Sequence, residues 1–449
     1  MTDVFCQKSV FVLGLGITGL GIANALKRWR AHVQVWDDCQ ERCRQVQGDY
    51  EICDFRNRSW KSDDLLVCSP GFSESHEIIL QARQANISVV ADIECFFRAY
   101  PHARVIGVTG SQGKSTTASL IAHVLKESGH SVSLSGNIGK SVFDLPEAVY
   151  QDTEHIFVFE LSSAQLLRTT SLNLWIGALV NLSPNHLDFH TTYSQYIAAK
   201  KRIFSCGATR GVIGINGPET QALFQEKPQL LPVSTKNTLG PGICVVDGEL
   251  FDFVHSTQAT LPMMPFLQGA HNQENFAIAY GVLRMAGVDV QSIMTHAPTF
   301  KGIRHRQENV GQYRHITFVN DSKATTPESA SVALRRFGPG QKVFWILGGQ
   351  PKVDNLDAVQ PYFAFVSHAY VLGEARALYT KILSQASVPH TVCENLQQAC
   401  DHAVTDAKGP AASVILLSPA CASFDQFSSF EHRGDTFCQH VQDRWLARV

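Results

Sequence analysis

The stretch VTGSQGKSTT, residues 108–117, decides how the fold of this chain is interpreted. The apolar segment RVIGV leads into it and the pattern ASLIAHVLKESG follows, which predicts a strand, a glycine turn and a helix. Such a turn points backbone N–H groups and a helix amino terminus at phosphate oxygens. Lys114 and Ser115 open the helix, where a lysine serves the terminal phosphates and a hydroxyl can ligate Mg²⁺. The stretch therefore predicts an ATP site.

Val108 stands where the longer form of this loop has glycine, so the match is to the shorter variant T-G-x-x-G-K-[ST]. A glycine turn that only caps a structural helix is the alternative interpretation. The strand before the loop and the helix after it favour phosphate binding.

A second glycine loop, GLGITG at residues 14–19, follows the apolar run SVFVL. Its spacing is that of a dinucleotide-binding loop, but on its own it does not separate a nicotinamide from another phosphate ligand. A redox enzyme has no need of the ATP loop, which favours another ligand here. Residues 9–26 carry no charge, yet their four glycines and β-rich first half favour a strand, a turn and a helix over a membrane span.

Composition limits the class of protein. The chain has 449 residues, which is too long for one ordinary core, and 44% of them are hydrophobic. A formal net charge of −2 gives no reason to expect nucleic-acid or membrane binding. The 12 cysteines form no C-x-x-C pair, so neither a zinc framework nor a disulfide scaffold is indicated. We expect a protein of the reducing cytoplasm.

Short apolar runs alternate with helical patterns along the chain, which is typical of parallel βαβ units and predicts the α/β class. Three such series are visible, and residues 242–254 add an antiparallel hairpin around Asp247-Gly248. We expect three domains, the first and third Rossmann-like and the central one like a P-loop ATPase. Their expected bounds are residues 1–100, 101–302 and 303–449.

Candidate metal ligands lie downstream of the ATP loop. Glu160 ends the strand HIFVFE, where a carboxylate could hold Mg²⁺ or could equally cap the next helix. His186 lies in the loop NLSPNHLDFH. In the expected helix 193–204, YSQYIAAKKRIF, the local pattern favours a surface position for Lys200 and solvated charges at Lys201 and Arg202.

The whole set of motifs resembles the Mur ligases, the ATP-dependent amide ligases of peptidoglycan precursor synthesis. The resemblance covers essentially the whole chain, and LLSPACASFDQF at residues 416–427 is the stretch most specific to the members that add D-glutamate. The other matching stretches are GLGITG, CSPGF, VTGSQGKST, SGNIGK, ELSSAQL, NHLDFH, YIAAKKRIF, LQGAHNQEN, HRQE, NDSKAT and ILGG.

The resemblance implies a role for each matching residue. The first glycine loop would hold the uridine diphosphate of a nucleotide-sugar substrate, and residues for that substrate would be Thr18, Asp37, Gly71, Asn137, Ser162 and Gln165. ATP would be bound by Gly110, Ser111, Gln112, Gly113, Lys114, Ser115, Thr116, Asn275, Arg306 and Asp321. Two Mg²⁺ ions would be held by Ser115, Glu160, His186 and a carbamylated Lys200. The catalytic groups would be Lys114, His186 and Lys200.

The D-glutamate pocket implied by the resemblance consists of Lys323, Thr325, Lys352, Ser423 and Phe430. Lys323 and Lys352 follow consecutive strands of the third series, at carboxyl ends where α/β domains bind ligands. Ser423 is expected at the start of a helix, where its hydroxyl and nearby N–H groups could take a carboxylate. Without the resemblance, solvated loop lysines would be an equal alternative.

The chain also departs from the family pattern, at Cys39, Ala164, Gln307 and Pro351. None of these departures removes a charged catalytic group. The expected partners are small-molecule substrates only, and we expect a monomer. A sister ligase, a nicotinamide oxidoreductase and a non-catalytic nucleotide-binding regulator are the alternatives that the sequence leaves open.

Overall fold

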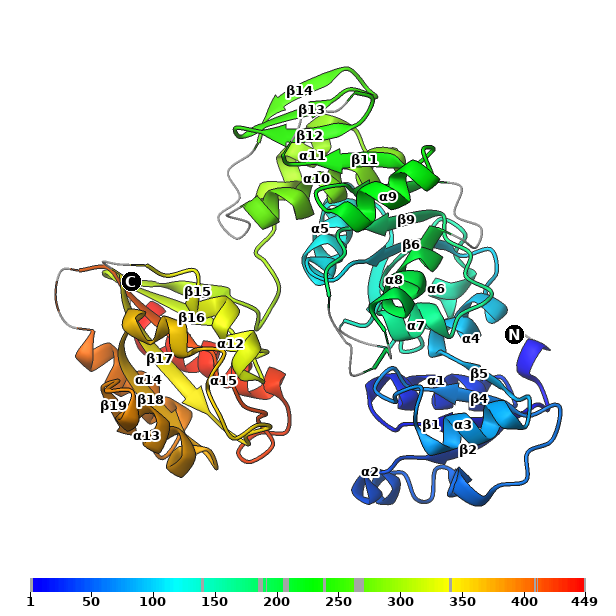
Figure 1. Cartoon of the computed structure of the whole chain (residues 1–449), viewed down its shortest axis with the longest axis horizontal. Helices are drawn as coiled ribbons and strands as arrows, with labels where there is room; N and C mark the ends of the chain where they lie inside the picture. The colour runs from blue at the N-terminus through cyan, green and yellow to red at the C-terminus, as the bar shows by residue number, and fades with distance from the viewer. Residues whose placement is uncertain are drawn as a thin grey trace. The chain divides into compact units, whose positions relative to one another are not determined.

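The structure is a computed structural model. It describes residues 3–138, 141–184, 189–190, 192–204, 210–236, 240–261, 270–338, 341–407, 409 and 411–447. Parallel-rich sheets alternate with helices along the chain, so the predicted α/β class is confirmed (Figure 1). Contacts within the chain define two compact units, Met1–Phe300 and Lys301–Val449.

The first sheet is wholly parallel, with strand order β3-β2-β1-β4-β5. Alternate side chains of β1 enter two different cores: Val10 and Val12 pack with helix residues such as Ile22, while Phe11 and Leu13 pack on the opposite face. The strands are β1 (Ser9–Leu13), β2 (His32–Trp36), β3 (Glu51–Ile52), β4 (Leu65–Cys68) and β5 (Ser88–Val90). The helices are α1 (Ile17–Arg28), α2 (Gln40–Gln45), α3 (Glu77–Gln84) and α4 (Asp92–Ala99).

The uncharged run at residues 9–26 is therefore a strand, a turn and most of α1, as predicted. In the described part of the chain, no helix is long and apolar enough to cross a membrane.

The second sheet, in the same unit, has the order β14-β13-β12-β11-β10-β9-β6-β8-β7. Its strands are β6 (Arg104–Thr109), β7 (Val132–Gly136), β8 (Ile156–Glu160), β9 (Ile176–Leu179), β10 (Gly211–Gly214), β11 (Leu231–Ser234), β12 (Ile243–Val246), β13 (Glu249–Asp252) and β14 (Thr257–Thr260). Its helices are α5 (Lys114–Glu127), α6 (Glu147–Gln151), α7 (Ser163–Leu167), α8 (Tyr193–Lys201), α9 (Pro218–Glu226), α10 (Ala270–Met285) and α11 (Val290–His296).

Of two local predictions for this sheet and its helices, the hairpin is confirmed and the length of one helix is wrong. The hairpin is confirmed, because β12 and β13 are antiparallel and both Asp247 (φ 51°) and Gly248 (φ 79°) have the positive φ that a two-residue turn requires. The helix expected over residues 193–204 is too long: α8 ends at Lys201, and Arg202–Phe204 form a 3₁₀ turn.

The sheet of the second unit has the order β15-β16-β20-β17-β18-β19, and only β15 runs antiparallel to its neighbour. Trp345 on β17 packs into the core that contains α13, and Ile346 into the core that contains α14. The strands are β15 (Glu308–Tyr313), β16 (Ile316–Asn320), β17 (Lys342–Gly348), β18 (Val366–Leu372), β19 (His390–Val392) and β20 (Ser413–Leu417). The helices are α12 (Pro327–Leu334), α13 (Arg376–Gln385), α14 (Leu396–Asp406) and α15 (Phe430–Val441).

Candidate active site

The first glycine loop joins β1 to α1, and each of its glycines has a different physical task. Gly14 has a φ of 99°, and a Cβ there would lie 2.7 Å from Phe72 and Ser69. A Cβ on Gly19 would lie 1.7 Å from the carbonyl oxygen of Gly14, so the helix packs directly on the loop. Gly16 has nothing within 4 Å of such a Cβ, which leaves room for a ligand to approach the backbone.

Asp37 follows β2 and is buried, with 2% of its surface exposed. Its carboxylate accepts hydrogen bonds from the backbone N–H groups of Leu15 (2.7 Å) and Cys39 (2.8 Å), so it holds the glycine loop in place. Thr18 is half-buried in the first turn of α1, and Gly71 is exposed in the loop after β4. The structure therefore brings the expected substrate residues of the first sheet to its carboxyl edge.

The ATP loop lies between β6 and α5, as predicted. Gly113 has a φ of 78°, and a Cβ there would lie 2.0 Å from the amide oxygen of Asn275 on α10. The ammonium of Lys114 donates to the carbonyl oxygens of Gly110 (3.0 Å) and Ser111 (3.1 Å), so it lies over the loop. The remaining expected residues of this loop are the exposed Gln112, the buried Ser115 and the half-buried Thr116.

Glu160 ends β8 and is buried, with 3% exposed. One carboxylate oxygen accepts a hydrogen bond from the side chain of Asn137 at 3.1 Å. The other, Oε2, is buried and accepts no hydrogen bond from any residue that the structure describes. A buried acceptor without a donor is costly, and a cation would satisfy it.

Lys200 is buried, with 2% exposed, so the surface position favoured by the local sequence is wrong. Its ammonium donates to the hydroxyl of Thr109 at 3.0 Å and lies 5.1 Å from the ring centre of Tyr196. Burial, helped by the charge of Lys114 and opposed by Glu160, holds its pKa well below the ordinary value for lysine. A lysine in this setting has an enlarged neutral fraction.

The structure describes only some of the predicted metal ligands. Among the described residues, no group of three or more His, Cys, Asp and Glu side chains could hold a metal ion. His186, predicted to be a ligand and a catalytic group, lies outside the described residues. Glu160, Ser115 and Lys200 are placed near the ATP loop, and a carbamate on Lys200 would add a second anionic ligand.

The prediction for Arg202 is also wrong. Its guanidinium donates to the carbonyl oxygen of Leu166 at 2.8 Å and also to that of Thr169, so it ties the 3₁₀ turn after α8 to the end of α7. Lys201 pairs with Glu226 at 3.1 Å, and that contact is exposed. A sequence pattern alone cannot separate these two cations, because the distinction depends on where α7 lies.

Ser162 and Gln165 form a capping box at the start of α7. The amide nitrogen of Gln165 also donates to the carboxylate of Asp92 at 3.2 Å, and Gln165 is fully buried. Burial raises the pKa of Asp92 to about 6, while the Gln165 hydrogen bond acts in the opposite direction. Both residues predicted for substrate contact thus also have a structural task.

In the second unit, Asp321 follows β16 and is buried, with 3% exposed. It accepts hydrogen bonds from the hydroxyl of Ser418 (2.7 Å) and the backbone N–H of Gln307 (3.1 Å). Burial raises its pKa to about 7, and the charges of Arg306 and Arg336 act in the opposite direction. Arg306 itself is exposed.

The residues predicted for D-glutamate gather around the carboxyl ends of β16, β17 and β20. The ammonium of Lys352 donates to the hydroxyl of Thr325 at 3.3 Å, and that of Lys323 lies 5.8 Å from the ring centre of Phe430. Ser423 is buried and does not start a helix: it opens a turn in which its carbonyl oxygen accepts from Phe427 at 2.8 Å. The expected helix, α15, begins at Phe430, because Ser429 provides its N-cap.

Arg433 is a residue of this edge that the sequence interpretation missed. It is 1% exposed and donates to the carbonyl oxygens of Ser322 (2.9 Å) in the loop after β16, and of Cys421 (3.0 Å) and Ala422 (3.2 Å) in the loop after β20. It also donates to the carbonyl oxygen of Gly348, the last residue of β17, at 3.5 Å. Burial lowers its pKa to about 10. One arginine in the otherwise polar start of a helix gives no signal in the sequence that it will be buried.

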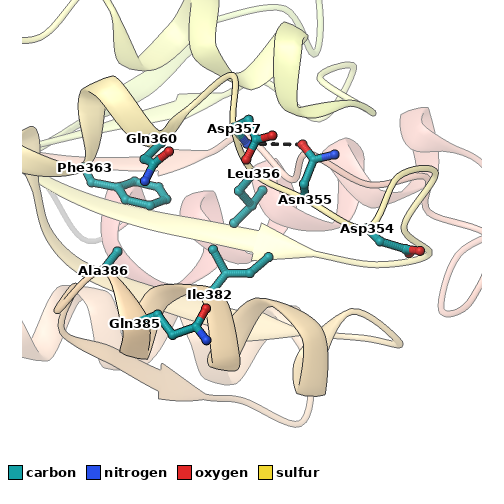
Figure 2. A pocket seen from close by; sticks show the side chains of 9 residues that line it. All are labelled: Asp354, Asn355, Leu356, Asp357, Gln360, Phe363, Ile382, Gln385 and Ala386. Atoms are coloured by element: carbon teal, nitrogen blue, oxygen red, sulfur yellow. Dashed lines mark hydrogen bonds between the residues drawn. The ribbon is translucent and has the colours of Figure 1, made fainter.

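The second unit also contains a cavity of about 260 Å³ whose lining includes none of the predicted site residues. The apolar side chains of Leu356, Phe363 and Ile382 face one another across it (Figure 2). Polar side chains surround them, namely Asp354, Asn355, Asp357, Gln360 and Gln385. The cavity lies between the segment after β17 and α13.

Comparisons with known proteins identify the family. Residues 108–283 match the Mur ligase middle domain, and residues 8–91 match the family described as Mur ligase MurD-like, N-terminal domain. The chain is 38% identical to the UDP-N-acetylmuramoylalanine–D-glutamate ligase of Paramagnetospirillum magneticum, over 97% of this chain and 96% of that protein. It is 32% identical to the protein of the same name from Rickettsia prowazekii, over 99% of this chain and 100% of that protein. This chain belongs to the Mur ligase family.

Solved structures share the fold at lower identity. The UDP-N-acetylmuramate–alanine ligase of Thermotoga maritima superposes with a TM-score of 0.57 at 15% identity, over 97% of this chain and 99% of that chain. A UDP-N-acetylmuramoyl-L-alanyl-D-glutamate–2,6-diaminopimelate ligase superposes with a TM-score of 0.54 at 16% identity, over 93% of this chain and 88% of that chain. At these identities the likeness concerns the fold alone.

The close packing of the first loop predicts that Gly19→Ala lowers the melting temperature. Alanine is normally the better helix former by roughly 0.5–1 kcal/mol. Here its Cβ would lie 1.7 Å from the oxygen of Gly14, so loop and helix must separate. Gly16→Ala is the matched control, because φ at Gly16 is −74° and the space around it is open. Equal melting curves for the wild type and Gly19→Ala, measured by circular dichroism, would contradict this packing.

The burial of Asp321 predicts that the stability of the second unit depends on pH. Since its pKa is raised to about 7, its contribution to stability is complete at low pH and is lost as the pH rises through about 7. Between about pH 5.5 and 8.5, the free energy of unfolding of the wild type should fall by about 2 kcal/mol relative to that of Asp321→Asn. Hydrogen exchange of residues 301–449 measures this difference, and Asp354→Asn, at an exposed carboxylate of the same unit, is the control. Identical pH slopes for the wild type and Asp321→Asn would refute the assignment.

Proposed function

We propose that this chain is the ATP-dependent ligase that joins D-glutamate to UDP-N-acetylmuramoyl-L-alanine and releases ADP and phosphate. The relatives of that name match the chain over nearly its full length. The structural observation that supports the proposal most directly is the burial of Lys200 and Glu160 near the ATP loop. There Lys200, with its suppressed charge, lies near Lys114 and near Glu160, whose Oε2 has no donor among the described residues.

The chemistry requires activation of a carboxylate. An amine does not attack a carboxylate anion, so the L-alanyl carboxylate first attacks the γ-phosphorus of ATP, which forms an acyl phosphate and releases ADP. The neutral amine of D-glutamate then attacks the acyl carbon, and the tetrahedral intermediate expels phosphate as the amide forms. Negative charge builds up around the transferred phosphoryl group, and Lys114, whose ammonium lies over the loop, would offset it.

The residues present fit a site for Mg²⁺. Glu160 offers a buried oxygen that has no donor among the described residues, Ser115 offers a buried hydroxyl, and His186 belongs to the proposed set. The neutral form of Lys200 can react with CO₂ to give a carbamate, which replaces a cation with an anionic oxygen ligand. Bound Mg²⁺ would supply charge stabilisation at the phosphoryl group. His186 or a nearby carboxylate would take the proton that the attacking amine loses.

The second unit would supply the D-glutamate pocket. Lys323 and Lys352 provide cations for two carboxylates, and the hydroxyls of Thr325 and Ser423 provide further donors. Phe430 would close one side, since its ring already lies near the ammonium of Lys323. Such a pocket disfavours L-lysine and diaminopimelate, whose distal amine would meet positive charge.

We further propose three domains, 1–100 for the UDP substrate, 101–302 for ATP and 303–449 for the amino acid. The residues around the first glycine loop, Thr18, Asp37 and Gly71, would bind the nucleotide end of the substrate. Asn137, Ser162 and Gln165 would contact its sugar-peptide part, while Asn275, Arg306 and Asp321 would contact ATP. The proposed enzyme is a cytoplasmic monomer that uses small-molecule substrates only.

ADP release, measured by a coupled assay with each substrate omitted in turn, tests the proposed function. We expect ADP only when ATP, Mg²⁺, the nucleotide substrate and D-glutamate are all present, and no turnover with L-lysine or diaminopimelate as the acceptor.

Lys114→Ala should reduce turnover by at least about 10³-fold and leave the fold intact, because this side chain contacts loop carbonyls and lies outside the core. Efficient use of another amino acid would point to a sister ligase. An absorbance change dependent on NAD(P)H would point to an oxidoreductase, and binding of ATP without turnover to a regulator.

A further inference from the structure

Arg168 is a buried cation that none of the proposed roles uses. It follows α7 directly, and only 1% of its side chain is exposed. Its guanidinium donates to the carboxylate of Glu74 at 2.7 Å and to the carbonyl oxygen of Ser69 at 3.3 Å, and it also contacts the carbonyl oxygen of Phe72. All three partners lie in the loop after β4, so one side chain holds that loop at three points.

The loop held by Arg168 supports the first glycine loop. The backbone N–H of Ser69 donates to the carbonyl oxygen of Leu13 at 2.9 Å, and its hydroxyl donates to that of Gly14 at 3.1 Å. The ring of Phe72 comes so close to Gly14 that a Cβ there would be 2.7 Å from it. A shift of residues 69–72 would therefore move the backbone that borders the open space at Gly16.

The backbone of Arg168, unlike its side chain, makes contacts near the ATP loop. Its backbone N–H donates to the carbonyl oxygen of Ala164 within α7, and α7 begins three residues after the proposed metal ligand Glu160. Its carbonyl oxygen accepts from the N–H of Ala91, at the end of β5, at 3.0 Å. Backbone and side chain together thus connect the first sheet to the segment that starts at Glu160.

We propose that Arg168 is a positioning residue that fixes the distance between the nucleotide-binding loop and the phosphoryl-transfer centre. The inference rests on the proposed function, in which one substrate molecule spans from the loop at Gly16 to the γ-phosphoryl group. Its reacting carboxylate must arrive in line with that group, and a misplacement of about 1 Å can reduce the rate about 10²-fold. Arg168 touches neither end of the substrate path; it acts through residues 69–74.

Arg168→Met tests the proposal, because methionine fills similar space without charge or donors. We expect kcat/KM for the nucleotide substrate to fall about 10–100-fold, the Kd of UDP measured by calorimetry to rise several-fold, and the KM of ATP to stay within about twofold. A purely structural arginine would lower the melting temperature and leave these constants unchanged at temperatures where the protein is folded. That pattern would overturn the proposal.

Arg58→Met, in the connection between β3 and β4, is the matched control. Arg58 pairs with Asp64 at 3.3 Å and lies 3.8 Å from the ring centre of Phe11, but it lines a cavity with Ser9 and His32, at the amino ends of β1 and β2. This variant should lose stability and keep its UDP affinity and kinetic constants.

Glu74→Gln keeps the proposal testable if Arg168→Met does not fold. It removes the charge of the partner and leaves the two carbonyl contacts of Arg168, so kcat/KM for the nucleotide substrate should fall by a smaller factor in the same direction. Unchanged constants in Glu74→Gln would count against the proposal. A wild type that releases no ADP with the full substrate set would overturn the proposed function instead, and the UDP titrations of the wild type and Arg168→Met would still decide the role of Arg168.

Discussion

The burial of Lys200 is the constraint on which the rest of the candidate site depends. An ammonium with 2% exposure, near Lys114, cannot remain an ordinary cation without cost. The parallel sheet creates this situation, because β6 pairs with both β8 and β9 and so sets Thr109 beside the end of the strand that carries Glu160. Helix α8 then brings the lysine onto the hydroxyl of Thr109. Reaction with CO₂ would relieve the imbalance, because it replaces the ammonium with an anionic carbamate, and a cation at Glu160 would then balance the charges of the carbamate and of Glu160.

Close contacts also hold the loops in place at the carboxyl ends of the strands. Gly136, at the end of β7, has a φ of 99°, and a Cβ there would lie 2.4 Å from the carbonyl oxygen of Glu160. That approach lets the side chain of Asn137 reach the carboxylate of Glu160. In the second unit, Arg433 holds the corresponding edge by hydrogen bonds to the loops after β16 and β20.

The sequence predicted the elements whose signal is local. The glycine loops at residues 14–19 and 108–117, their strands and helices, and the hairpin at Asp247-Gly248 each follow from spacing and turn chemistry. Burial of single polar residues was not predictable, because it depends on what another element brings to them. Lys200 is buried against the strands of the second sheet, and Arg433 against loops more than about 10 residues away in sequence. The half-buried Arg202 is held by the end of α7. The turn at Ser423 was missed because Ser429, six residues later, provides the stronger helix cap.

The measurement that tests the central claim most directly is ¹³C NMR of the protein with Mg²⁺ and ¹³C-labelled bicarbonate. The wild type should show a carbamate carbon signal that disappears in Lys200→Ala. Lys201→Ala, at the neighbouring lysine with its exposed partner Glu226, should keep the signal. Absence of the signal in the wild type, or its persistence in Lys200→Ala, would contradict the account.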